Sequence, residues 1–208
     1  MARKYELKKR AEKQEQTRQR IVQAVADLHE EVGPANTTIK GIAERAGVQR
    51  LTVYRHFPDE RSMFEACGAL FMEQNPPPDP AHWTQIDDPV VRLRTGIEEL
   101  YDYYSRTERM TANVLRDAAK IPDLAAVVDP IEEAMHQYAL ILIEPWEGSA
   151  EDRHYLQAAT VHAILFTTWQ SLIREQHMSQ TDAVDLMVRM ISCLADCSSS
   201  ESGCSDQV

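Results

Sequence analysis

The chain has 208 residues, with 22 Lys or Arg against 33 Asp or Glu, and therefore a formal net charge of −11 at pH 7. A chain of this length can bury a substantial core in one or two domains, which argues against general disorder. Its longest unbroken apolar run, residues 138–143, is far shorter than the roughly 20 residues that cross a bilayer, so we expect no membrane-spanning helix. No apolar stretch with a cleavage site for export follows the charged N-terminus, so we expect a cytoplasmic protein.

Charge is distributed unevenly along the chain. Residues 1–62 contain 13 Lys or Arg and 9 Asp or Glu, whereas the remaining 146 residues contain 9 and 24. A basic N-terminal third on an acidic body is typical of a protein that meets nucleic acid at one end only. The first twenty residues, with eight basic and three acidic side chains, also fit a solvated and partly disordered tail.

Four cysteines are present, Cys67, Cys193, Cys197 and Cys204. A chain of this length needs no disulfide framework, so they fit a reducing compartment. Cys193 and Cys197 are one helical turn apart, but no nearby histidine or second close pair completes a tetrahedral metal site. We therefore predict no metal site and no cofactor. Cys193 is expected in the core, and Cys197 and Cys204 in a loose tail.

Apolar periodicity predicts three helices in the N-terminal third. Residues 14–32 repeat apolar side chains at spacings of four, three and four, which marks one face of a helix. Thr37 and Thr38 can offer capping hydroxyls to a short helix over residues 39–46, and Gly47 can end it because glycine adopts the left-handed conformation without strain. A third helix is expected over residues 49–57. Two short helices joined by a glycine-containing turn form the helix-turn-helix pattern, whose second helix can enter the major groove of DNA.

The third helix carries side chains suited to DNA. Val53 and Phe57, four residues apart, would hold it on the body of the protein. The side chains expected to project outward match the edges of base pairs, because arginine pairs with guanine, glutamine pairs with adenine, and a threonine methyl can meet a thymine methyl. These outward residues are Gln49, Arg50, Thr52 and Arg55. Tyr54 and His56 suit phosphate oxygens.

The segment TTIKGIAERAGVQRLTVYRHFPDERSMF, residues 37–64, resembles the DNA-binding domain of TetR-family transcriptional regulators. The most specific part of the resemblance consists of Gly47, Val48, Tyr54, His56 and Phe57. The resemblance covers about residues 15–65, and the helical remainder fits the family without any motif. It implies a homodimer that binds a palindromic operator in double-stranded DNA, and a larger domain whose small-molecule effector releases the DNA. Most members of the family are repressors, so a repressor is expected.

Two positions depart from the family's pattern. Leu51 stands where members usually have a small residue, and Glu60 stands where they usually have a lysine at the start of the fourth helix. An acid facing DNA would repel phosphate there, so either Arg61 makes this contact or the contact is absent, and we assign it to Arg61. The predicted DNA-binding residues are therefore Thr38, Lys40, Gln49, Arg50, Thr52, Tyr54, Arg55, His56 and Arg61.

The rest of the chain is expected to be helical as well. The predicted fold is all-α with about nine helices, in which a three-helix domain with the helix-turn-helix precedes a larger ligand-binding and dimerisation domain. Apolar stripes place the later helices at residues 60–74, 89–106, 108–120, 131–144, 151–176 and 180–196. The predicted domains are a basic N-terminal extension (1–14), a DNA-binding domain (15–60), a ligand-binding and dimerisation domain (61–197) and a disordered tail (198–208).

The last two predicted helices are apolar on nearly all sides, so one body cannot cover them. We therefore expect a second copy of the chain to pack against them in a four-helix bundle about a two-fold axis. The two half-sites of the operator would lie about 34–36 Å apart, or a multiple of that distance. The predicted interface residues are Val161, Leu165, Leu172, Val184, Met187, Ile191 and Leu194.

Aromatic and polar side chains on the helices of the acidic body predict a ligand pocket between them, because pockets in helix bundles are mostly apolar with few polar groups. The predicted pocket residues are Tyr101, Tyr104, Asn113, Arg116, Met135, His136, His162, Phe166 and Trp169. The effector would be a flat or hydrophobic organic molecule with one or two hydrogen-bonding groups. The simpler alternative for each of these residues is core packing.

A helical enzyme or small-molecule carrier that retains a basic hairpin is the alternative function. Glu133 and His136 are spaced as in half of a di-iron bundle site, but the second half is missing. His154 and His162 stand two helical turns apart, too far to share a metal, and the sequence contains no phosphate-binding loop or nucleophile motif. We therefore predict that the chain is not an enzyme.

Overall fold

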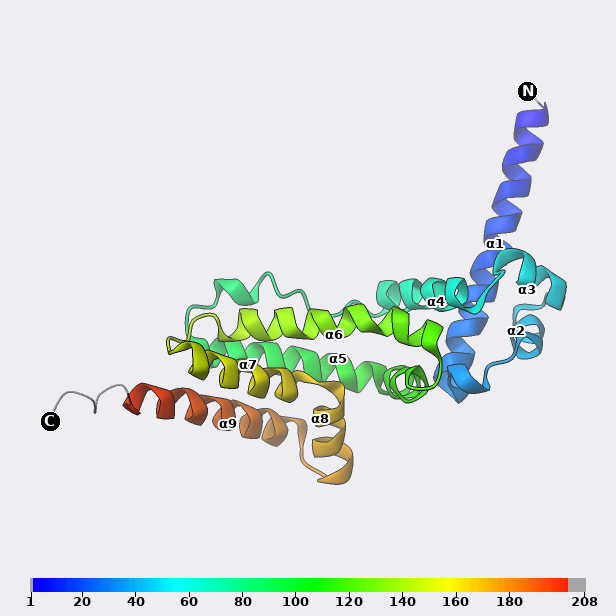
Figure 1. The fold of residues 1–208 in the computed structure, drawn as a ribbon. Helices are drawn as coiled ribbons and strands as arrows, with labels where there is room; N and C mark the ends of the chain where they lie inside the picture. The colour runs from blue at the N-terminus through cyan, green and yellow to red at the C-terminus, as the bar shows by residue number, and fades with distance from the viewer. Residues whose placement is uncertain (1, 202–208) are drawn as a thin grey trace, which may run out of the picture. The chain divides into compact units, whose positions relative to one another are not determined.

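The computed structural model describes the backbone of residues 2–201 and the side chains of residues 5, 6 and 8–195, and all regular structure in this part of the chain is helical (Figure 1). The all-α prediction is confirmed. The α-helices are α1 (Ala2–Val32), α2 (Ile39–Ala46), α3 (Arg50–His56), α4 (Glu60–Gln74), α5 (Pro89–Ala118), α6 (Pro122–Ile143), α7 (Ala150–Ile164), α8 (Phe166–Gln170) and α9 (Gln180–Glu201). Short 3-10 helices occur at Pro34–Asn36 and Trp83–Gln85, and a π-helix at Ser171–Glu175. None of the described helices is both long and apolar enough to cross a bilayer.

The chain forms two compact units, and each of the helices α5 and α6 has one end in the first unit and the other end in the second. The first unit consists of the residues up to Pro76 and Thr107–Asp129, and the second consists of Pro77–Arg106 and the residues from Pro130 onward. Residues 61–76 and 107–129, which the sequence analysis assigned to the ligand-binding domain, thus belong to the first unit. Met63, Cys67 and Met110 explain this, because all three pack into the hydrophobic core around α1.

α1 starts well before the predicted helix over residues 14–32. Its core-facing side chains begin only at Ile21, which packs with Val25, Ile42 and other apolar residues of the first unit. The described side chains before Ile21 are almost all exposed, and they form no apolar stripe. Periodicity reports a helix through its buried face, so it could not report this part of α1.

α5 and α6 are each longer than the sequence analysis expected. Residues 89–106 and 108–120, predicted as two helices, form one helix that ends at Ala118. The polar segment between them contains no glycine or proline, so the gap in the apolar stripe does not interrupt the backbone. α6 begins at Pro122, a favourable first position for proline, and continues through Pro130, which was expected to separate two segments.

The helix predicted over residues 151–176 is broken at Leu165, whose backbone is extended with φ −70° and ψ 144°. A break of this kind leaves backbone carbonyl groups without their helical partners. The hydroxyl groups of Tyr101 and Tyr104 donate hydrogen bonds, at 2.8 and 2.7 Å, to the carbonyl oxygens of the last two residues of α7. Because buried carbonyl groups need partners, these two tyrosines stabilise the break.

The last helix extends to Glu201, beyond its predicted end, so the first part of the predicted tail is helical. The rest of that tail, with Cys204, lies outside the described residues, as does the side chain of Cys197. Cys193 is exposed, which contradicts its predicted place in the core. Cys67 is buried, and burial raises the pKa of its thiol to about 12, so this cysteine packs as a neutral side chain.

Candidate nucleic-acid interface

The turn between α2 and α3 has the geometry that the sequence predicted. Thr38 Oγ1 accepts a backbone N–H of the first turn of α2 at 3.1 Å and so caps this helix. Gly47 adopts the left-handed conformation, with φ 65° and ψ 41°. The N–H groups of Gly47 and Val48 donate to the carbonyl oxygens of Glu44 and Ala43, at 3.3 and 2.9 Å, which is the Schellman motif that closes a helix. α3 then begins after only two further residues.

α3 is docked on one side and exposed on the other. Val53 and Phe57 are 0% and 2% exposed and hold the helix on the core of the first unit, as predicted. The exposed face of α3, which we call the reading face, consists of Arg50, Leu51, Tyr54 and Arg55. Neither arginine of this face has an ion-pair partner among the described side chains, so both guanidinium groups can bind a guanine edge or a phosphate.

The other three predicted residues of this segment lie outside the reading face. Gln49 is exposed just before α3, where its side chain makes no capping hydrogen bond. Thr52 and His56 are half-buried beside the docked side. The outward position expected for Thr52 belongs to Leu51, which is 68% exposed. Helical spacing carries this signal, because Leu51 shares a face with the residues three and four positions later.

The start of α4 carries more negative charge than a phosphate contact favours. Asp59 Oδ1 accepts the Ser62 N–H at 2.7 Å, and this backbone hydrogen bond is the main reason that the pKa of the Asp59 carboxyl is lowered. Glu60 is exposed in the first turn. Arg61 donates a hydrogen bond to Glu65 at 3.0 Å, so it reaches a phosphate only after it leaves this partner. Lys40 of α2, also exposed, is held only by a weak pair within its own helix.

Two of the predicted pocket residues, Asn113 and Arg116, lie in the first unit and fix the end of α1. The Asn113 amide donates to two backbone carbonyl oxygens in the last turn of α1, at 3.0 and 2.9 Å. Arg116 donates two hydrogen bonds to Asp117, at 2.8 and 2.9 Å, and the same carboxylate accepts the Ala35 N–H at 3.0 Å. The Arg116 guanidinium lowers the pKa of the Asp117 carboxyl. The pocket prediction is wrong for Asn113 and Arg116, whose polar groups bind each other and the backbone.

Most of the other predicted pocket residues pack together in the second unit. The residues of this aromatic core are Tyr101, Tyr104, Met135, Phe166 and Trp169. The rings of Phe166 and Trp169 lie 5.5 Å apart, and Trp169 is 1% exposed. His136 and His162 are exposed and take no part in this core. Trp169 Nε1, in this core, and Thr160 Oγ1, in α7, are buried without a hydrogen-bond partner among the described residues.

A concave site of about 410 Å³ does exist in the second unit, but none of the predicted pocket residues lines it. Its lining residues are Thr84, Arg92, Gln137, Leu140, Ile141 and Glu144. Arg92 is buried and bonded to Glu144 at 2.9 Å and to backbone carbonyl oxygens, so its donors are already used. In the described part of the chain, no three His, Cys, Asp or Glu side chains lie close enough to hold a metal ion.

The predicted dimer interface is wrong on α9. Val184, Met187 and Ile191 are buried within the chain, so its own residues already cover them. The outward stripe of α9, as we call it, is the other apolar one and consists of Leu186, Met190 and Cys193. The remaining predicted interface residues, Val161, Leu165, Leu172 and Leu194, are half-buried. Both stripes of α9 are apolar, so the sequence alone did not determine which of them faces inward.

The fold and the reading face define a helix-turn-helix protein, and comparison with known proteins agrees. Residues 21–67 match the sequence model of the family described as "Bacterial regulatory proteins, tetR family". A segment of 49 residues is 43% identical to the nucleoid occlusion factor SlmA of Marinobacter nauticus and covers 24% of this chain and 25% of that protein. A segment of 55 residues is 34% identical to the class A tetracycline repressor protein of Escherichia coli and covers 26% of each chain. These matches thus span about a quarter of the length of the curated relatives.

Similarity over most of the chain is found at the level of the fold. The crystal structure of a TetR-family transcriptional regulator from Streptomyces coelicolor superposes with a TM-score of 0.63 at 19% identity, and the match covers 90% of this chain and 83% of that one. Residues 21–67 therefore resemble the bacterial regulatory proteins of the tetR family, and the chain as a whole is similar to a TetR-family regulator in its fold.

Proposed function

We propose that the chain is a transcriptional repressor that binds a palindromic operator as a homodimer and leaves it when a small, mostly apolar organic molecule binds. The reading face of α3 carries the DNA-binding part of this proposal. Two arginines without an ion-pair partner among the described side chains, a tyrosine and a leucine stand exposed on a short helix that is fixed by a capped and closed turn. Arginine is the commonest side chain for bidentate contact with guanine, and an exposed tyrosine suits a phosphate.

The outward stripe of α9 supports the homodimer. Met190 is 59% exposed, and Leu186 and Cys193 lie beside it on the same side of the helix. A stripe of this kind is costly to leave in water, and self-association about a two-fold axis covers it in both copies at once. The same axis supplies two recognition helices, so the operator would be an inverted repeat with half-sites about 34–36 Å apart, or a multiple of that distance.

The aromatic core of the second unit supports the release step. Trp169 Nε1 of this core is buried without a hydrogen-bond partner among the described residues, and a ligand with a hydrogen-bond acceptor would satisfy it. α5 contributes Tyr101 and Tyr104 to this core, and its last turns hold the end of α1 through Asn113. The effector releases DNA only if it binds more tightly to a form with poorly spaced recognition helices, and such coupling is typically about 1–3 kcal/mol.

Selection of binding sites from a randomised duplex library tests the DNA-binding part of the proposal, and Met190→Glu tests the homodimer. The wild-type protein is expected to be dimeric and to select an inverted repeat. Met190→Glu places a charge in the outward stripe, so it is expected to be monomeric and to bind the inverted repeat about 100-fold more weakly or worse. Measurements are sedimentation for the oligomeric state and gel shift for binding.

Thr181→Glu is the matched control, because it adds the same charge at an exposed position of α9 outside the stripe. It is expected to stay dimeric and to bind as the wild type does. A wild-type protein that is monomeric, or that selects no inverted repeat, would refute the proposal. A dimeric Met190→Glu variant would leave DNA binding intact but remove the outward stripe as the interface.

Leu51 leads to a prediction about base recognition. An exposed leucine on the reading face can bury its surface in the major groove only against an apolar group, and the thymine methyl is that group. Replacement of the contacted thymine by uracil should weaken binding of the wild type by about fourfold per half-site, as expected from about 0.8 kcal/mol for one buried methyl group. Leu51→Ala should bind more weakly overall and be insensitive to uracil at that position.

A gel-shift scan that replaces each thymine of the selected operator by uracil measures this effect. Leu51→Met, which keeps a long apolar side chain, is the control and should retain the sensitivity to uracil. If Leu51→Ala and the wild type lose the same factor at every thymine, Leu51 does not contact a methyl group.

A further inference from the structure

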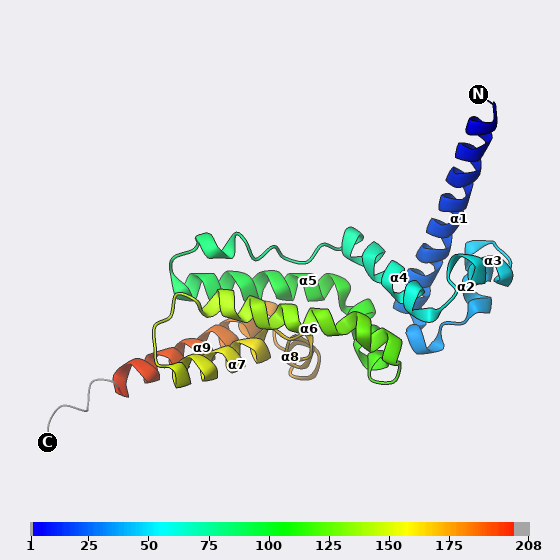
Figure 2. The ribbon, with the colours of Figure 1, turned by 45° about the horizontal axis from the view of Figure 1, so that its top comes forward.

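The N-terminal half of α1 is a helix that the fold of the first unit does not need. The family domain starts at residue 21, and the hydrophobic core of the unit also starts at Ile21, whereas α1 starts at Ala2. Both views of the ribbon show this half extending past α2, α3 and α4 (Figures 1 and 2). Isolated helices gain most of their stability from a packed apolar face. Residues 8–16, all of them exposed, have no such face, so their side chains are available to a partner.

Basic side chains follow one face of this half of α1. The basic stripe, as we call it, consists of Lys9, Lys13, Gln16 and Arg20, spaced by four, three and four residues. All of them are exposed, and none of the three cations has an ion-pair partner among the described side chains. Two acidic residues, Glu6 and Glu12, flank the stripe, because each stands three residues from Lys9, and Glu12 pairs with Lys8 at 3.9 Å. At a rise of 1.5 Å per residue the stripe is about 17 Å long.

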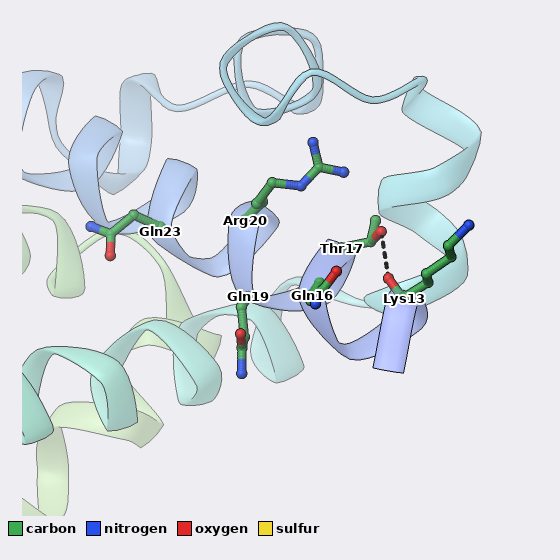
Figure 3. A pocket seen from close by; sticks show the side chains of 6 residues that line it. All are labelled: Lys13, Gln16, Thr17, Gln19, Arg20 and Gln23. Atoms are coloured by element: carbon green, nitrogen blue, oxygen red, sulfur yellow. Dashed lines mark hydrogen bonds between the residues drawn. The ribbon is translucent and has the colours of Figure 1, made fainter. Parts of the chain in front are cut away.

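The stripe continues to the helix-turn-helix. A polar groove of about 690 Å³ along α1 is lined by Lys13, Gln16, Thr17, Gln19, Arg20 and Gln23 (Figure 3). In Figure 3 the side chains of Arg20 and Gln19 leave the helix in opposite directions. Arg20 Nη1 lies only 3.8 Å from the position that a Cβ atom on Gly47 would take, at the turn between α2 and α3. The neighbouring Arg18 stacks on Phe57, with 5.1 Å between its Cζ atom and the ring centroid. The last cation of the stripe therefore adjoins the proposed DNA-binding surface.

The chemistry of the stripe selects the DNA backbone as its partner. Double-stranded DNA carries one negative charge per about 1.7 Å of its axis, so a straight row of cations about 17 Å long meets several phosphates. Lysine, arginine and glutamine side chains all donate hydrogen bonds to phosphate oxygens. A helix that binds a membrane surface needs large apolar side chains opposite its basic face, and residues 8–20 contain none.

From the stripe's position and chemistry we infer that it binds phosphates of the duplex that flanks each operator half-site. This inference rests on the proposed function, because it extends the same interface outward from the reading face. It concerns residues before the family domain and assigns them a role in affinity rather than in sequence recognition, since phosphate contacts carry no sequence information.

The test compares two double variants of the full-length protein that remove the same charge. Lys9→Gln/Lys13→Gln removes two cations of the stripe, and Lys8→Gln/Arg10→Gln removes two exposed cations from other faces of the same helix. Glutamine keeps a high helix propensity, so both variants should fold. Binding of each protein to the selected inverted repeat with long flanks is measured at a series of salt concentrations.

The stripe variant is expected to bind more weakly, with a slope of log K against log salt that is shallower by about 1.8 per chain, or about 0.9 for each lost phosphate contact. The control variant should change this slope by less. On a long duplex of unrelated sequence, the stripe variant is expected to show the same weaker binding and the same shallower slope. On a duplex trimmed to the inverted repeat, the stripe variant and the wild type should bind equally.

Several outcomes would overturn the inference. Equal losses in the two double variants would show an effect of net charge alone, and wild-type binding by the stripe variant would show that the stripe makes no contact. Co-sedimentation of the wild type, but not of the stripe variant, with vesicles of anionic lipid, together with unchanged duplex binding, would make a membrane surface the partner. If the wild-type protein binds no duplex at all, the proposed function itself is refuted. If the wild type binds and the two double variants do not differ, only the inference about the stripe is refuted.

Discussion

Trp169→Ala is expected to lower the free energy of unfolding by about 3–5 kcal/mol, the range for loss of a fully buried large aromatic side chain. Trp169 is 1% exposed, and its ring lies 5.5 Å from that of Phe166 and 6.1 Å from that of Tyr104. These two rings also adjoin the break at Leu165, so the cavity would open where the backbone already lacks helical bonds. A typical domain is stable by only about 5–15 kcal/mol, so this loss is a large fraction of the total.

Urea unfolding followed by far-UV circular dichroism measures this loss without the tryptophan fluorescence that the substitution removes. Trp169→Phe is the control: it leaves a smaller cavity and removes an indole N–H that has no partner among the described residues, so it should cost less. A loss of under about 1 kcal/mol for Trp169→Ala would mean that the second unit is loosely packed there, as an open pocket would be. For tests of effector binding, Trp169→Phe is therefore the better variant, because it removes the donor and keeps the core.

The helix-turn-helix could be predicted from sequence because its determinants are local. The capping hydroxyl of Thr38 and the left-handed Gly47 act within a few residues of their own position, and both take the predicted geometry. The docking of α3 also follows from local spacing, since Val53 and Phe57 are one helical turn apart. Leu51 shows the limit of this approach. Its departure from the family's pattern was visible in sequence, but its orientation was assigned to Thr52, one residue away.

The second unit was harder to predict because its determinants are tertiary. The break at Leu165 depends on the hydroxyl groups of Tyr101 and Tyr104, which are about sixty positions away in the chain. Apolar side chains continue on both sides of the break, so periodicity predicted one helix. α9 has two apolar stripes, and only packing within the chain determines that Val184 faces inward and Met190 outward.

The pocket prediction failed for its polar residues for a similar reason. Asn113 and Arg116 look like ligand-binding groups when only their type and helix are known. In the structure their hydrogen bonds go to the end of α1 and to Asp117, which the sequence analysis did not consider. A buried acidic residue next to an arginine is a signal for such a network, because a buried carboxylate needs a partner. Sequence spacing cannot identify that partner when it lies in a distant segment.

Acid is expected to destabilise the first unit through His29 as the pH falls from 6.5 towards 4. His29 is buried, with Nδ1 3.5 Å from Cys67 Sγ and its ring 5.7 Å from that of Phe64. Burial lowers the pKa of this imidazole from 6.5 to about 4, against a smaller opposing effect of the Asp117 carboxylate. Below pH 6.5 the unfolded chain therefore binds a proton that the folded chain does not. The free energy of unfolding therefore decreases as the pH decreases through this range. The total decrease is about 3 kcal/mol, at about 1.4 kcal/mol per pKa unit.

Urea unfolding at a series of pH values tests this prediction. His29→Gln should lose the His29 part of the pH dependence between pH 6.5 and 4, whereas His136→Gln, which changes an exposed histidine, should keep it. If His29→Gln is too unstable to compare, NMR titration of the wild-type imidazole gives the pKa directly. A pKa near 6.5 in the folded protein, or the same pH dependence in all three proteins, contradicts the prediction. Because His29 packs in the unit that carries the reading face, the loss of stability is expected in that unit.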